Sequence, residues 1–170
     1  GAITSSIGIG AGGNLTVNVS ELSLSGGSGL VTATLGTGKA GNLVINSSQL
    51  NLENGAAISA DTLGAGNAGN LNINSQQLTV ESGSRIGAGT SESSTGLGGK
   101  VTINATDSVE LIGTSADGTL PSQVVASTLG TGNAGDLRIE TGNLIIRDGA
   151  RVTVSGEGVG AAGNLDAIAN

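Results

Sequence analysis

The sequence predicts an all-β protein: a right-handed parallel β-helix (β-solenoid) with three strands and about 28 residues per coil, and five to six coils. Three observations predict this fold. A self-similar pattern returns along the chain, most often after 28 residues. Aliphatic and polar residues alternate inside each repeat, which is the period of a strand. Glycine fills 32 of 170 positions, and each would cost a helix roughly 1 kcal/mol. The handedness follows because parallel crossovers are overwhelmingly right-handed.

Each repeat opens with an aliphatic anchor that follows a glycine and one polar residue. The steps between anchors are 28, 28, 30, 36 and 28 residues. The anchors are Leu15, Leu43, Leu71, Val101, Leu137 and Leu165. The repeats therefore start near residues 13, 41, 69, 99, 135 and 163, and residues 1–170 are interpreted as one β-solenoid segment of a longer array.

Three strands are expected in each repeat. The first holds the anchor and an aliphatic residue two positions later: Val17, Ile45, Ile73, Ile103 and Ile139. The second begins seven residues after the anchor, with a slip of one residue in the fourth repeat: Leu22/Leu24, Leu50/Leu52, Leu78/Val80, Val109/Leu111 and Leu144/Ile146. The third follows a turn and carries Leu30, Ile58, Ile86, Val124 and Val152.

Energetics require these repeats to stack. Ordering the backbone costs about 1–2 kcal/mol per residue, whereas each buried aliphatic side chain returns only about 1.5–3 kcal/mol, and a repeat supplies about six. A single repeat is therefore unstable. Pairing equivalent strands in parallel ladders, about 4.8 Å apart, satisfies the backbone and builds a continuous core.

Two polar columns are expected from this stacking. Amides three residues after the anchor predict a hydrogen-bonded ladder of Asn18, Asn46, Asn74 and Asn104, which ends at Glu140 in the fifth repeat. A second column contains Thr34, Thr62, Thr90 and Thr128. Regularly spaced threonines on a flat face raise an ice-binding alternative, but only Thr32-Ala33-Thr34 has the two-column pattern which that function needs.

The two longer steps mark insertions at residues 91–98 and 113–122. Solenoids place insertions outside the coil, often on a binding face. The second insertion contains the only proline of the chain, and its possible recognition residues are Thr114, Ser115, Asp117 and Pro121. An insertion that contacts no ligand is the competing interpretation.

The composition excludes several classes of chemistry. The chain has no His, Cys, Met, Phe, Tyr or Trp, which removes imidazole and thiolate catalysis, N/S metal sites and aromatic platforms. We expect no cofactor. A net charge of −7 argues against nucleic-acid binding, and no segment predicts membrane insertion.

Glycine-rich strings match the dinucleotide pattern G-x-G-x-x-G five times, beginning at residues 8, 36, 64, 130 and 158. A phosphate site requires a helix after the loop, whereas each string runs into an expected strand. They are interpreted as turns in which glycine supplies positive φ.

Carboxylates are the remaining candidates for chemistry. Asp107, Glu110 and Asp117 lie close in sequence and could serve a polysaccharide-active enzyme, but no apolar pocket or sugar-binding wall accompanies them. Glu53 and Glu81 fall in one column of adjacent repeats. Whether they share a cation is left open, with solvated edge residues as the simpler interpretation.

The strings GNAGNL, TLGTGNAGDL, VELIGTSADGTLPS and LIIRDGARVTVSGEG resemble the repeat region of cyanobacterial filamentous-haemagglutinin-like proteins of the two-partner-secretion type. Nearly the whole chain takes part in this resemblance. It implies a β-helix shaft, secretion through an outer-membrane partner pore, an extracellular or cell-surface location, and no catalytic residues.

These patterns together favour a non-enzymatic structural shaft of a fibrous adhesin or extracellular matrix filament. Its expected partners are copies of itself or neighbouring repeats stacked end to end, because neither end of the sequence reads as a cap. The alternative is a module that binds polysaccharide or another cell-surface ligand through the 113–122 loop. An ice-binding solenoid and a polysaccharide-active enzyme are less favoured.

Overall fold

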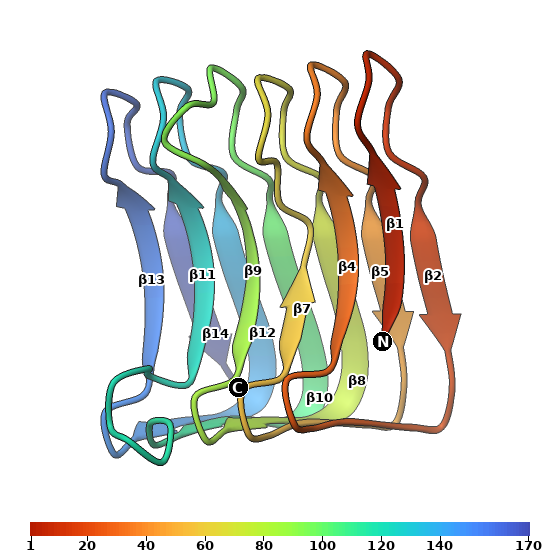
Figure 1. Ribbon diagram of the computed structural model, residues 1–170. Coiled ribbons are helices and arrows are strands. Elements are labelled where there is room, and N and C mark those ends of the chain that lie inside the picture. The colour runs from red at the N-terminus through yellow and green to blue at the C-terminus, as the bar shows by residue number, and fades with distance from the viewer.

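The computed structural model describes residues 1–170 and is all-β, with no helix. Parallel strands wind into a β-solenoid of about six coils, which confirms the predicted fold (Figure 1). The strands facing the viewer run upwards, those behind run downwards, and coils are added from right to left, so the solenoid is right-handed. It has no helix long and apolar enough to cross a membrane.

Two sheets run the length of the solenoid. The six-stranded sheet contains β1 (Ala2–Ser6), β4 (Gly29–Thr34), β7 (Ala57–Ser59), β9 (Arg85–Thr90), β11 (Gln123–Thr128) and β13 (Arg151–Gly156). The eight-stranded sheet contains β2 (Leu15–Asn18), β3 (Glu21–Leu24), β5 (Leu43–Asn46), β6 (Gln49–Leu52), β8 (Leu71–Glu81), β10 (Val101–Ile112), β12 (Leu137–Arg147) and β14 (Leu165–Ala169).

The first and second strands of a coil are separate only in the first two coils. From β8 onwards they merge into one long strand that bends around a corner of the solenoid (Figure 1). The slip predicted in the fourth repeat is an irregularity in β10 between Ala105 and Ser108, which pair with Ser75 and Gln77 of β8. One extra residue therefore enters β10 at this corner.

The core is one stack of aliphatic side chains. It comprises 24 buried residues, and all anchors from Leu43 to Leu137 have no exposed surface. Columns open up in the outermost strands: Leu165 is 50% exposed and Ile146 is 43% exposed. Burial thus depends on having a coil on both sides, as the energetics of a single repeat require.

Glycine-rich arches connect the six-stranded sheet to the next anchor, at the top of Figure 1. A Cβ on Gly38 would overlap the carbonyl oxygen of Gly10, and one on Gly66 would overlap that of Gly38. The same relation holds at Gly96, Gly132 and Gly160. None of these glycines has positive φ. The prediction that arch glycines supply positive φ is therefore wrong: they allow close approach of successive backbones.

Positive φ occurs instead in the tight turns that precede the six-stranded sheet. Asn54 and Gly55 have φ of 54° and 75°, and Ser82 and Gly83 have 54° and 76°. Two consecutive positive φ angles are the pattern of a type I′ turn. The backbone N–H of Ala56 closes the first of these turns on the Glu53 carbonyl.

Candidate functional site

The four asparagines of the predicted ladder lie on one exposed column of the eight-stranded sheet. The amide of each donates to the side-chain oxygen of the preceding one, at 2.7 Å from Asn46 to Asn18, 2.8 Å from Asn74 to Asn46 and 3.1 Å from Asn104 to Asn74. Because each rung leaves a donor and an acceptor for the next, the ladder adds directional bonds along the solenoid axis.

The ladder stops at Glu140, which pairs with Asn104 in register. Arg138 of the same strand donates to the Glu140 carboxylate at 3.0 Å and also pairs with Asp166 of β14. The hydrogen bond to Glu140, followed by attraction to Asp166, raises the pKa of Arg138. This cluster of charges is saturated internally, so it offers no free group for acid or base chemistry.

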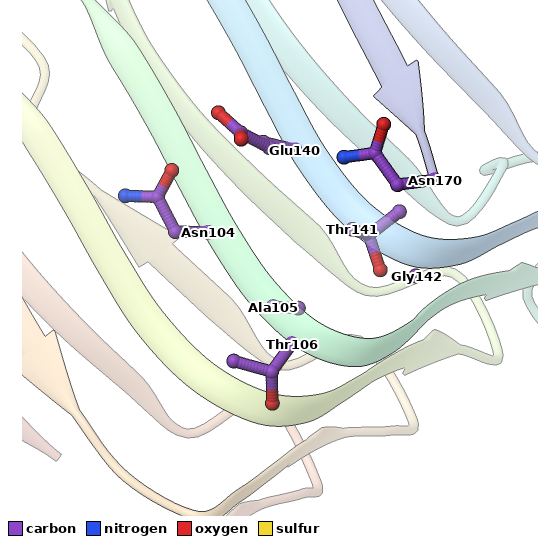
Figure 2. Close-up of a pocket in the computed structure, with 7 residues that line it drawn as sticks. All are labelled: Asn104, Ala105, Thr106, Glu140, Thr141, Gly142 and Asn170. Carbon is purple, nitrogen blue, oxygen red and sulfur yellow. The ribbon is translucent and has the colours of Figure 1, made fainter.

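A hollow of about 450 Å³ lies beside the end of the ladder. Figure 2 shows its lining residues on β10, β12 and the end of β14: Asn104, Ala105, Thr106, Glu140, Thr141, Gly142 and Asn170. The hollow is open to solvent, and its only charged side chain is the paired Glu140. It can accept polar groups from water or a ligand, but it has no cation for an anionic ligand.

A second amide column was not predicted. The side-chain oxygens of Asn14, Asn42 and Asn70 accept the backbone N–H of the residue that precedes the next anchor, at 2.8, 3.0 and 3.1 Å. In the fifth coil Asp136 takes this role for Asn164, and the backbone hydrogen bond lowers the pKa of its carboxyl group. The recurring polar residue before each anchor was the sequence signal for this column.

The 113–122 insertion forms a small hairpin outside the coil. Thr114 and Pro121 form an antiparallel bridge, and Ser115 and Leu120 are joined by a backbone hydrogen bond of 2.7 Å. The hydroxyl of Ser122 donates to the Ile112 carbonyl and accepts the Gly83 N–H of the preceding coil at 3.1 Å. The hairpin is thus folded on itself and fixed at its base to a neighbouring turn.

Asp117 organises the tip of this hairpin. Its carboxylate accepts the Ser115 hydroxyl and then the backbone N–H and hydroxyl of Thr119, which together lower its pKa to about 2. A general acid needs the opposite shift. Asp107 lies at the irregular corner of β10 and Glu110 lies further along that strand, so these two carboxylates belong to the coil and Asp117 to the hairpin.

The other insertion, at residues 91–98, only lengthens one arch. Nine positions separate Thr62 from Leu71, whereas eleven separate the equivalent Thr90 from Val101. Ser94 is buried in this arch and its N–H donates to the Ser91 carbonyl.

The threonine column faces the interior of the solenoid. Thr34, Thr62 and Thr128 have no exposed surface and Thr90 is also buried, with its hydroxyl 2.7 Å from that of Thr128. An array that orders ice must be exposed, so these threonines do not supply one. The sequence alone could not separate an inward hydroxyl column from an outward one.

Glu53 and Glu81 occupy successive positions of one column, because Leu52 pairs with Val80 immediately before them. No group of three or more Asp, Glu, His or Cys residues is placed to hold a metal ion. The five dinucleotide-like strings all lie in the arches and run into strands, so no helix N-terminus is present to hold a phosphate.

No family model, curated protein or solved structure matches this chain.

Proposed function

We propose that this chain is a non-enzymatic structural shaft of a fibrous adhesin or extracellular filament. The observation that carries the proposal is the unbroken stack: every coil pairs in register with the next, and one apolar cluster continues through the interior. Such a stack resists bending because each coil is fixed to its neighbours along three faces.

Stacking with further coils, from copies of this chain or from neighbouring repeats, completes the proposal. Leu165 and Ile146 belong to columns whose inner members, such as Leu137 and Leu111, are fully buried. Their outer sides, and the unpaired edges of β13 and β14, present apolar surface and free backbone groups. Covering them restores the burial that the inner coils have.

Electron microscopy and fibre diffraction of the concentrated chain test this function. We expect rods that lengthen with concentration and a meridional reflection near 4.8 Å, the coil spacing. Leu165→Asp should abolish the lengthening, because it places a carboxylate on the open coil face. The matched control, Val159→Asp, adds the same charge on an arch residue that is 86% exposed and should leave rods intact. Rods of fixed length at all concentrations, or equal effects of both substitutions, would contradict the proposal.

Secretion through an outer-membrane partner pore and an extracellular or cell-surface location are part of the proposal, and they are supported by the motif resemblance alone. Labelling of intact cells with an antibody against the chain tests the location. Labelling that appears only after lysis would refute it.

A second candidate is recognition of a cell-surface ligand by the hairpin. It is favoured by the preformed tip around Asp117 and by Leu120, which is 58% exposed. Ile112 pairs with Glu81 and Gln123 with Arg85, so Ser82–Ser84 of the third coil can replace residues 113–122 without changing the register. Adhesion that survives this replacement supports the shaft, and adhesion that disappears supports the hairpin.

A further inference from the structure

The outer face of the six-stranded sheet carries a shallow groove that the sequence patterns did not indicate. Two hollows of about 210 and 220 Å³ lie along it, and both are lined by Arg85 and Ser127. Because they share these residues, they form one channel that crosses successive strands. We call it the arginine groove and define it by Asp61, Arg85, Gln123, Ser127, Arg151 and Thr153.

Glycines form the floor at one end of the arginine groove. Gly87 and Gly89 of β9 face outwards, and a Cβ on Gly87 would lie 2.8 Å from the Arg85 guanidinium. Arg85 therefore lies flat on the sheet and reaches Asp61 at 3.1 Å, while Asp61 accepts the Gly89 N–H at 2.8 Å. This end of the groove is rigid and electrically neutral.

The other end holds a cation without an acidic partner. Three of the four arginines form salt bridges, and Arg151 is the one that does not. Its Nε donates to the Gln123 side chain at 3.2 Å, which holds the guanidinium in place and leaves its two terminal nitrogens free. Glu157 lines the same hollow, but its carboxylate accepts the Ser155 hydroxyl at 3.2 Å.

We propose that the arginine groove binds a carboxylate-bearing polysaccharide, such as a uronic-acid polymer. The free fork of Arg151 matches a carboxylate, which it can bind with two parallel hydrogen bonds. Hydroxyl and amide groups of Ser127, Thr153 and Gln123 lie beside it for sugar hydroxyls. One coil advances about 4.8 Å, close to the advance of one pyranose ring, so a sugar chain along the axis meets equivalent positions in register.

A peptide fits this surface less well. The strands that form the groove are hydrogen-bonded on both sides, so none offers an edge for an added strand. The groove also lacks a deep apolar pocket, since Val125 is its only apolar residue beside Arg151 and is itself buried. The proposal does not depend on the shaft function, because a single molecule carries the whole groove.

Calorimetric titration with an oligogalacturonate, and with its fully methyl-esterified form as the uncharged probe, tests the proposal. We expect the acid to bind and the ester to bind at least tenfold more weakly, because the ester cannot accept charge-assisted hydrogen bonds from Arg151. Arg151→Gln should weaken binding of the acid by roughly tenfold or more. Glu157→Gln should strengthen it, because a like charge leaves the groove.

Arg147→Gln is the matched control, since Arg147 is an exposed arginine of β12 that pairs with Asp148 outside the groove. It makes the same change in net charge and should leave affinity unchanged. Circular dichroism melts verify that all variants fold. Absence of binding by the unmodified chain, equal binding of acid and ester, or equal losses in Arg151→Gln and Arg147→Gln would overturn the proposal.

Discussion

The two connections that flank the six-stranded sheet differ in how closely they are packed. In the arches, backbone lies directly on backbone, and a Cβ on Gly66 would overlap the carbonyl of Gly38. In the tight turns, a Cβ on Gly55 would meet nothing within 4 Å. Glycine is therefore required for space in the arches and for conformation in the turns. This contrast explains why the arch lengthens by only two residues, whereas the turn corner accommodates a complete hairpin.

Gly66→Ala should have the largest effect on this contrast. Its methyl group has no space against the Gly38 carbonyl, so two coils must separate locally and lose backbone hydrogen bonds. We expect a loss of about 3 kcal/mol in the free energy of unfolding, measured by urea denaturation. A loss below that of Gly55→Ala would mean that the arches are not closely packed.

Gly55→Ala should cost about 1–2 kcal/mol, because only the strain of a left-handed backbone opposes it. Gly55→Asn is the matched variant and should recover part of this loss, since asparagine tolerates positive φ. Denaturation midpoints of the two variants give the comparison. Equal losses for Ala and Asn would indicate a steric cause instead.

Asn74→Ala breaks two rungs of the amide ladder, whereas Asn18→Ala breaks one. We expect about 1 kcal/mol for Asn74 and about half of that for Asn18, because the column is exposed and water replaces the lost partners. Thermal melts of both variants test this ratio. Equal effects would show that the rungs contribute independently of their neighbours.

Asp117 should give the smallest effect, confined to acid conditions. Its pKa of about 2 in the folded chain lies below the usual value near 3.9 in an unfolded chain. Its contribution to stability is therefore complete above about pH 4 and is lost as the pH falls towards 2. The stability difference between the unmodified chain and Asp117→Asn should shrink over this window. A carboxyl titration by NMR with a midpoint near 4 would refute the assignment.

The sequence predicted the architecture because anchors and alternating pairs state the period directly. The irregularity in β10 was also visible, as a slip between Val101 and Val109. The arch glycines were misinterpreted because a glycine string does not say whether conformation or space requires it. The burial of the threonine column depends on the phase of each strand, which Thr34 and its equivalents do not reveal by themselves.

The arginine groove could not be found from the sequence for a different reason. Arg85, Gln123 and Arg151 are consecutive members of one column, but the insertions place them 38 and 28 residues apart. Only the register makes them neighbours. The floor of the groove is equally hidden, because Gly87 and Gly89 look like any other glycines in a chain that has 32.

The hydrogen bonds between coils run parallel to the long axis, and the chain passes from each coil to the next without interruption. Tension applied along this axis pulls neighbouring coils apart at the outermost pair first, and each detached coil unravels as extended polypeptide. With about 28 residues per coil and 3.3–3.6 Å per residue, one such event lengthens the tether by about 90–100 Å. A stiff rod at rest thereby becomes an extensible spring that yields stepwise before any covalent bond is strained.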